Sequence, residues 1–328
     1  MHASSEPRPS PAGVTRLAPS PTGALHLGNA RTFLINWALA RRHGWTIVLR
    51  IEDLDTPRNK PGAIEQTLED LRWLGVDWDQ GPIIQSADLS AHVRAMNALA
   101  AAGLVYPCAL SRAEIEAAAS APQSGAESHE VRFPAALRPP LAPLPFDDPH
   151  TNWRFAVPDE SVRIHDAFAG DAQFRPCDTV GDFVVWTKRA QPSYQLAVVV
   201  DDHRQRVTHV VRGDDLLESA ARQTLLYRAL GLSPTPRWFH LPLVVGADRR
   251  RLAKRHGDSR LARYRDLGVR AERVLGLLAW WSGAGAGAGC APREMTRDEF
   301  LHQFDLATMP KAPVIFRPED ESWLLARS

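Results

Sequence analysis

Short apolar runs alternate with longer amphipathic segments along most of the chain. Apolar, β-branched runs at residues 14–18 and 45–51 predict buried parallel strands. A segment with a helical period follows each strand, at residues 30–43 and at residues 61–74. Gly44 is expected to end the first of these helices. This alternation of strand and helix predicts an α/β fold built on a parallel sheet.

The second half of the chain repeats the pattern. Residues 182–187, 194–202 and 207–213 predict three more strands of the same sheet, the middle one because an uninterrupted apolar run ends in two aspartates. Helices are expected at residues 87–102, 218–230 and 271–282. Thr296 and Glu299 have the spacing of a capping box, which predicts a short helix over residues 296–304.

Composition shifts divide the chain into five expected segments. Residues 121–149 are rich in Pro, Ala, Ser and Gly with little periodicity, which indicates a mobile loop. The segments are a disordered lead-in (1–13), the first half of an α/β domain (14–105), an inserted α/β subdomain that contains the loop (106–181), the second half of the α/β domain (182–256), and a helical stem and tail (257–328).

Charge and cysteine content narrow the function classes. The net charge of +1 argues against a protein whose whole surface binds nucleic acid, although it allows a local basic face. The three cysteines are far apart and odd in number, which suits a reducing cytoplasm. No apolar run reaches the ~20 residues of a membrane span, and the polar start is not a secretory signal. A cytoplasmic protein without membrane contact is therefore expected.

The turn between the first strand and the first helix is a candidate phosphate site. Pro19 and Pro21 stiffen it, Gly23 and Gly28 allow close approach of a ligand, and His26 adds a donor. A helix N-terminus after such a turn offers backbone N–H groups and a positive dipole end. The four residues His26 to Asn29 alone are equally consistent with an incidental histidine in a proline-rich loop.

A second candidate lies after the strand at 45–51, where Glu52, Asp53 and Asp55 follow in close succession. In an open α/β sheet, ligands bind beyond the carboxyl ends of the strands. This place suits ligand binding better than packing, although a polar exit from a strand would look the same.

The stretch Arg16–Asn29 (RLAPSPTGALHLGN) closely resembles the signature of class I glutamyl-tRNA synthetases, in which the HIGH tetrad binds ATP; Asn29 departs from its last residue. Three further motifs occur in the family's order: Arg50–Asp53 (RIED), the aspartate-rich segment that continues to Val-Val-Arg212-Gly, and the basic loop at 249–255. The resemblance covers about residues 14–310. It implies a Rossmann-like parallel sheet with an inserted α/β subdomain and a small helical C-terminal stem.

The resemblance also assigns roles to individual residues. Glu52 should hold the α-amino group of glutamate, Tyr194 should contact its side chain, and Arg212 and Arg16 should serve its two ends. An arginine suits a carboxylate because its planar fork donates two parallel hydrogen bonds. Taken alone, Arg212 would more readily form a salt bridge with Asp214 or Asp215. The full glutamate-binding set is Arg16, Leu17, Ala18, Pro19, Ser20, Glu52, Tyr194 and Arg212.

For ATP, the resemblance implies His26, Gly28, Asn29 and Lys254, with His26 and Lys254 as the catalytic pair. Lys254 falls on the second lysine of the KMSKS-type loop and can neutralise charge on the phosphates. Arg251 and Ala253 depart from that motif, and the alternative for the loop is a solvated basic face. Mg²⁺ would accompany ATP.

Relatives bind structural zinc after the position of Cys108. Leu110 stands where a second cysteine would be, and no other cysteine follows until Cys177. A tetrahedral zinc site needs four ligands. We therefore expect no structural zinc and apolar packing in its place.

The chain ends at Ser328, which leaves no room for the helical anticodon-binding domain of a full glutamyl-tRNA synthetase. It looks like the core-only branch of the family, the glutamyl-Q tRNA(Asp) synthetases. The resemblance implies tRNA-independent activation of L-glutamate by ATP and its transfer to queuosine at the wobble position of tRNA(Asp), by a monomer. Two alternatives remain: a truncated glutamyl-tRNA synthetase that charges a tRNA 3′ end, and an inactive paralogue that only binds RNA.

Overall fold

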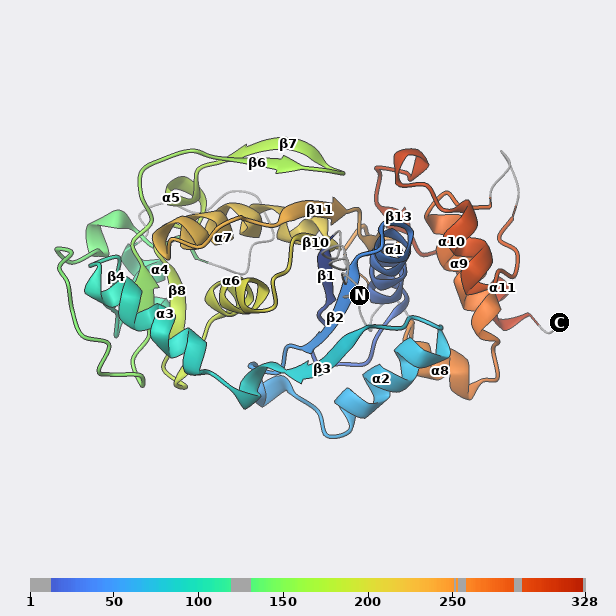
Figure 1. Cartoon of the computed structure of the whole chain (residues 1–328), viewed down its shortest axis with the longest axis horizontal. Helices are drawn as coiled ribbons and strands as arrows, with labels where there is room; N and C mark the ends of the chain where they lie inside the picture. Colours follow the sequence, from blue (N-terminus) through green and yellow to red (C-terminus); the bar gives the residue numbers. More distant parts are fainter. Residues whose placement is uncertain (1–12, 119–130, 251, 253–257, 286–290, 327–328) are drawn as a thin grey trace, which may run out of the picture.

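The computed structural model describes residues 13–118, 131–250, 252, 258–285 and 291–326. Its centre is a seven-stranded sheet in the order β3-β2-β1-β10-β11-β6-β7 (Figure 1). The strands are β1 (Val14–Leu17), β2 (Thr46–Ile51), β3 (Gln80–Ile84), β6 (Val162–Asp166), β7 (Gly170–Phe174), β10 (His209–Gly213) and β11 (Arg237–Leu241). All neighbours pair in parallel except β6 and β7, which form an antiparallel hairpin. The expected α/β fold on a mostly parallel sheet is confirmed.

Helices cover both faces of this sheet and give it two hydrophobic cores. On one face, α1 (Leu27–His43) packs with the C-terminal helices, and on the other lie α6 (Tyr194–Arg204) and α7 (Leu217–Ala229) (Figure 1). Successive strand residues alternate between the cores: Val211 and Phe239 face α1, whereas Val210 and Trp238 pack with α7. A sheet buried on both sides explains why its strands read as unbroken apolar runs.

The first helix ends where the sequence predicts. Gly44 has φ 65° and its N–H donates to the carbonyl of Ala40, a left-handed C-terminal cap that suits glycine. The helix α2 (Ala63–Trp73) follows β2, and α3 (Ser90–Ala101) follows β3.

A second, four-stranded antiparallel sheet lies at the opposite end of the molecule from the C-terminus (Figure 1). It contains β4 (Val105–Pro107), β5 (Trp153–Phe155), β8 (Phe183–Thr187) and β9 (Gln191–Pro192), with the short helices α4 (Arg112–Ala118) and α5 (Pro176–Thr179) nearby.

The C-terminal part is helical, as expected for a stem. It comprises α8 (Leu261–Asp266), α9 (Ala271–Trp281), α10 (Arg297–Gln303) and α11 (Pro318–Leu325), while β13 (Val314–Ile315) pairs with β12 (Val244–Val245). The capping box predicted for Thr296 and Glu299 is confirmed, with both reciprocal hydrogen bonds present.

Two sequence-based assignments are wrong. Residues 194–202 belong to helix α6 and not to a strand. The prediction failed because a helix that is buried on every side shows no periodic alternation of apolar and polar residues, so its apolar run looks like that of a buried strand. Residues 183–187 pair with β5 and β9 in the antiparallel sheet, not in the main sheet. Residues 162–174, within the segment expected to form the inserted subdomain, form the hairpin of β6 and β7, which extends the main sheet. The division into domains itself stays a prediction.

Candidate active site

A row of basic side chains crosses the face of the main sheet that α6 and α7 cover. Arg16 of β1, Arg50 of β2, Arg212 of β10 and His240 of β11 all share the face of Val210 and Trp238, because the register pairs Arg16 with Val48 and Arg212 with His240. Each of the four is buried. Buried charges must be paired or bind a ligand, so their partners decide what this row can do.

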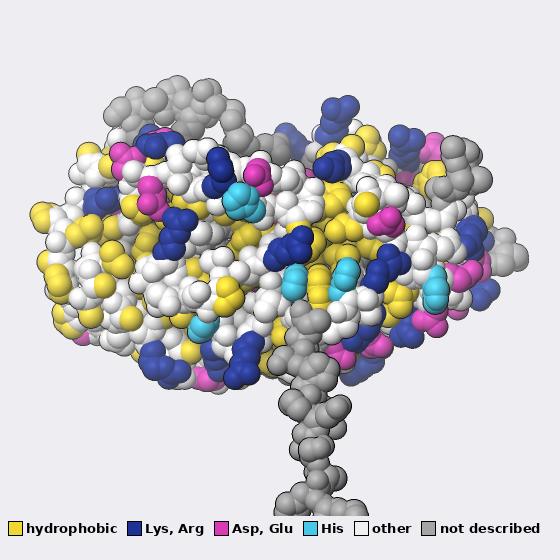
Figure 2. All heavy atoms as spheres, turned by 45° about the horizontal axis from the view of Figure 1, so that its top comes forward, with side chains coloured by type: hydrophobic (Ala, Val, Ile, Leu, Met, Phe, Trp, Pro, Cys, Tyr) yellow, Lys and Arg dark blue, Asp and Glu magenta, His cyan; other side chains and the backbone are white. Residues whose placement is uncertain are grey.

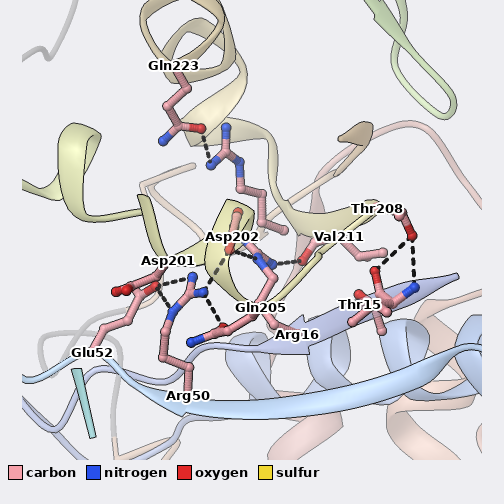
Figure 3. Close-up of polar contacts among 12 residues, drawn as sticks. Thr15, Arg16, Arg50, Glu52, Asp201, Asp202, Gln205, Thr208, Val211 and Gln223 are labelled. Carbon is pink, nitrogen blue, oxygen red and sulfur yellow. Dashed lines mark hydrogen bonds and ion pairs between the residues drawn. The ribbon is translucent and has the colours of Figure 1, made fainter. Parts of the chain in front are cut away.

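Arg16 and Arg50 share one carboxylate from α6. Asp202 Oδ1 accepts a hydrogen bond from Arg50 Nη1 at 2.7 Å and lies 3.5 Å from Arg16 Nε. Arg50 also donates to Gln205 Oε1 at 2.8 Å, and Arg16 Nη1 donates to the carbonyl of Val211 at 3.3 Å (Figure 3). This network connects strands β1 and β2 to helix α6.

Glu52 lies at the edge of the same network. Its Oε1 accepts from Arg50 Nε at 3.2 Å and from Nη2 at 2.9 Å, and its side chain is 14% exposed (Figure 3). Among the described residues, Oε2 has no hydrogen-bond donor. Glu52 therefore presents a carboxylate oxygen that can accept a hydrogen bond from an ammonium group.

Arg212 differs from the other arginines of the row because its partners are neutral. It donates to His240 Nε2 at 2.9 Å, to Gln223 Oε1 at 3.0 Å and to the carbonyl of Leu216 at 3.2 Å, and its guanidinium carbon lies 4.9 Å from the centre of the Trp238 ring. Burial lowers the pKa of Arg212 from its usual value. No carboxylate of the described residues lies within ion-pair distance of Arg212. The alternative that Arg212 forms a salt bridge with Asp214 or Asp215, both of which are described, is therefore wrong.

Tyr194 joins Arg212 to an open pocket. Its hydroxyl lies 3.5 Å from Arg212 Nη1, and the charges of Arg212, Glu52 and Arg16 all act on it. The residue is 39% exposed, so a ligand can reach it. It lines a cavity of about 620 Å³ between β8, β9 and the start of α7, together with Lys188, Arg189, Asp215, Ser219 and Arg222.

His26 caps the N-terminus of α1. Its Nδ1 accepts from the N–H of Gly28 at 3.1 Å and of Asn29 at 3.3 Å. The N–H groups on either side of these two are also hydrogen-bonded: Leu27 donates to the carbonyl of Ser259, and Ala30 donates to the carbonyl of His26. In this conformation the helix N-terminus offers no free first-turn N–H, so a phosphate there requires the His26 ring to move. The predicted ATP contacts of Gly28 and Asn29 stay predictions.

The basic loop is anchored beside His26 at two places. Within the loop, the N–H of Leu252 donates to the carbonyl of Val244, and Val244 Cβ lies 3.5 Å from the position of a Cβ built on Gly28. After the loop, Arg260 forms a β-bridge with His26. Lys254, Arg251 and Ala253 lie outside the described residues, so the predicted role of Lys254 stays a prediction.

Comparison with known proteins shows the family. Residues 13–320 match the model of the class I tRNA synthetase (E and Q) catalytic domain. The chain belongs to the class I glutamyl- and glutaminyl-tRNA synthetase family. It is thus a ligase, as predicted.

Two relatives and one structure illustrate the family. The Glutamyl-Q tRNA(Asp) synthetase of Symbiobacterium thermophilum is 46% identical over 91% of this chain and 94% of its own length. A Glutamate–tRNA ligase of Trichlorobacter lovleyi is 36% identical over 95% of this chain and 65% of its own length. The crystal structure of a glutamate tRNA ligase of Elizabethkingia meningosepticum in complex with its amino acid has a TM-score of 0.77 and 28% identity, over 95% of this chain and 68% of that one.

The remaining residues predicted for this family are placed unevenly. The side chain of Leu17 is fully buried in the core beside α1, so any ligand contact must come from its main chain. Ala18 is half-buried, Pro19 is buried and accepts a hydrogen bond from the N–H of Glu52, and Ser20 is exposed. Asp53 serves the fold, since its carboxylate accepts hydrogen bonds from the N–H and the hydroxyl of Ser86, in the 3-10 turn that follows β3.

Cys108, the cysteine considered for a zinc site, lies in a small apolar cluster with Tyr106, Ile115, Phe133 and Ala156. Across the described residues, no three His, Cys, Asp or Glu side chains gather in a way that could hold a metal. The expectation of no structural zinc stays a prediction. In the same part of the chain, no helix is long and apolar enough to cross a membrane.

Sequence reasoning missed the residues that hold the site together. Arg50, Asp202, Gln223, His240 and Asp166 were not among the candidates. One signal was available: Arg50 interrupts an apolar strand, and a charge in a buried strand requires a partner. Which residue supplies that partner, 152 positions away, is not visible in the sequence.

Proposed function

We propose that this synthetase activates L-glutamate with ATP in the absence of tRNA, and then transfers the glutamyl group to queuosine at the wobble position of tRNA(Asp). The amino acid is supported by the site and by the glutamate-specific names of the relatives. The tRNA and its modified base rest on the higher identity to the Glutamyl-Q relative, 46% against 36%. We further propose that the enzyme acts as a monomer in the cytoplasm.

The observation that carries the proposal is Arg212, a buried guanidinium surrounded by neutral partners. Within the protein, Arg212 donates hydrogen bonds from Nε, from Nη1 and from one hydrogen of Nη2. No contact with a described residue uses the second Nη2 hydrogen, which can therefore bind a ligand. A buried cation without a carboxylate favours an anionic ligand. A substrate with two carboxylates suits this sheet face, because Arg16 lies on the neighbouring strand.

Glutamate fits the remaining groups of the face. One carboxylate would bind Arg212 near the Tyr194 hydroxyl, and the other end would lie towards Arg16. Its ammonium group would donate to Oε2 of Glu52, which accepts no hydrogen bond from the described residues. Three charges of the ligand would then meet three opposite charges, which is the condition for binding a zwitterion with an extra carboxylate.

In the activation step, the α-carboxylate of glutamate attacks the α-phosphorus of ATP. A new bond forms between the carboxylate oxygen and phosphorus, and the bond to pyrophosphate breaks. His26 and the N-terminus of α1 would hold the nucleotide, and the loop residue Lys254 would neutralise charge that develops on the phosphates. Mg²⁺ is expected to enter on the phosphates of ATP, and we assign it no ligand from the protein.

In the transfer step, a hydroxyl of the queuosine cyclopentenediol attacks the activated carbonyl carbon, and the bond to AMP breaks. The cavity beside Tyr194 gives the acceptor a path to that carbon, and its rim carries Lys188, Arg189 and Arg222, which suit phosphodiesters. Figure 2 shows further Lys and Arg side chains around an apolar central patch on one face. These features support an RNA partner. That this RNA is tRNA(Asp) is proposed from the name of the Glutamyl-Q tRNA(Asp) synthetase to which the chain is similar.

Two assays test the proposal in order. ATP–pyrophosphate exchange should require glutamate and proceed without tRNA, and Arg212→Ala should abolish it; absence of exchange in the wild type would instead favour an inactive RNA-binding paralogue. Labelled glutamate should then pass to tRNA(Asp) that carries queuosine and not to tRNA(Asp) that lacks it. Charging of unmodified tRNA(Glu) would show that the protein is a glutamyl-tRNA synthetase.

A further inference from the structure

Behind Arg212 lies a fully buried pair of side chains. His240 of β11 and Asp166 at the end of β6 have fully buried side chains, and His240 Nδ1 lies 2.6 Å from Asp166 Oδ2. On the other side of the ring, His240 Nε2 lies 2.9 Å from Arg212 Nε. Asp166, His240 and Arg212 therefore form a continuous hydrogen-bonded chain that runs from β6 across β11 to β10.

The chemistry of arginine fixes the proton on the histidine ring. A guanidinium can only donate, so His240 Nε2 must accept and cannot carry a proton. The ring proton then lies on Nδ1 and is donated to Asp166. Burial lowers the pKa of His240, against the opposing effect of Asp166, which keeps the ring neutral at neutral pH.

Asp166 is held so that it can only accept. Its Oδ1 accepts the N–H groups of Phe168 at 2.9 Å and Ala169 at 2.7 Å, and the N–H of His240 lies 3.2 Å from both oxygens. The pKa of Asp166 is low, since these hydrogen bonds and the one from His240 outweigh the opposing effect of burial. The carboxylate thus stays ionised and selects the Nδ1–H form of His240.

We infer that Asp166 and His240 are positioning residues, which orient the guanidinium of Arg212 so that its remaining Nη2 hydrogen meets the carboxylate of the amino-acid substrate. This inference rests on the proposed function, because the substrate carboxylate is glutamate's. The Nε bond fixes the plane of the guanidinium, while Gln223 and Leu216 hold the Nη atoms. A guanidinium free to rotate would lose the geometry that a carboxylate requires.

Two substitutions of His240 separate orientation from packing. In His240→Gln the amide reaches the position of Nε2 and can still accept from Arg212, whereas in His240→Asn it reaches only the position of Nδ1. Loss of one hydrogen bond to a charged group corresponds to about tenfold or more in affinity. We expect the KM for glutamate in pyrophosphate exchange to rise about tenfold or more in His240→Asn and to change less than about threefold in His240→Gln, with the KM for ATP unchanged in both.

Asp166→Asn tests the tautomer. The three backbone N–H groups require the amide oxygen at Oδ1, so the amide nitrogen faces His240 and turns Nδ1 into an acceptor. The proton moves to Nε2, where it meets the Arg212 N–H, and the KM for glutamate should rise at least as far as in His240→Asn. Equal KM values for His240→Asn and His240→Gln, or no change in either, would overturn the inference.

Nitrogen NMR of histidine-labelled protein gives a result that does not depend on activity. The His240 signals are assigned by their loss in His240→Gln. The wild type should show a protonated Nδ1 and an unprotonated Nε2 at neutral pH. The opposite tautomer, or a doubly protonated ring, refutes the positioning role even if exchange is normal. Absence of exchange alongside the expected tautomer refutes the proposed function and leaves the tautomer-selecting pair established.

Discussion

The substitution Asp202→Asn removes the one carboxylate shared by Arg16 and Arg50. At an effective dielectric constant of ~20, separations of 2.7 Å and 3.5 Å correspond to gross attractions of about 6 and about 5 kcal/mol. The cost of burying the three ions offsets most of this attraction, but the two arginines stay buried when the carboxylate is lost. Breaking a buried ion pair on one side costs about 3–5 kcal/mol, and we expect the free energy of unfolding to fall by that amount.

The measurement is urea denaturation of the variant and the wild type. The midpoint should fall while the slope stays the same, because the surface exposed on unfolding does not change. Asp88→Asn is the matched control. Asp88 forms an exposed ion pair with Arg204, which lies on the same helix as Asp202, so the urea midpoint of Asp88→Asn should match that of the wild type. A loss below about 1 kcal/mol in Asp202→Asn would show that Glu52 and Gln205 suffice to compensate Arg50, and would refute the reasoning.

Three further substitutions test the fold and the site. Burial raises the pKa of Asp70 to about 6 from 3.8, so its protonation stabilises the fold below pH 3.8 and this contribution is lost as the pH rises through about 6. Relative to the wild type, Asp70→Asn should therefore gain up to about 3 kcal/mol in unfolding free energy between pH 4 and pH 7, and parallel pH curves would contradict this. Gly181→Ala places a Cβ 2.1 Å from the carbonyl oxygen of Phe133 and should cost about 2 kcal/mol or more by denaturation, well beyond Gly170→Ala, whose Cβ meets no atom within 4 Å. Glu52→Gln should raise the KM for glutamate about tenfold or more and leave that for ATP unchanged, and an unchanged glutamate KM would remove Glu52 from the amino-acid site.

The sequence predicts the first part of the sheet well because its signals are local. The strand at β1, the helix ended by Gly44 and the strand at β2 each have a period or a terminating residue within a few positions. The resemblance likewise selects Arg16, Glu52, Tyr194 and Arg212, and the structure brings these four together between one face of the sheet and α6.

The rest depends on contacts between distant positions. Arg212 and His240 meet because β10 and β11 are neighbours, and Asp166 reaches His240 because β6 joins the same sheet from another part of the chain. No pattern within any one of these segments reveals the order of strands. The buried pair behind the substrate arginine therefore becomes visible only in the folded protein.

The wrong assignment of α6 has a consequence for the site itself. Tyr194 and Asp202 are eight residues apart, which is about 12 Å along a helix and about 26 Å along a strand. Tyr194 lies beside Arg212 and Asp202 beside Arg16, and these arginines are on adjacent strands about 4.8 Å apart. A strand would carry Tyr194 and Asp202 too far apart to reach both arginines. Only a helix over this segment allows one element to pair Arg16 and contact Arg212 while leaving room for a small amino acid between them.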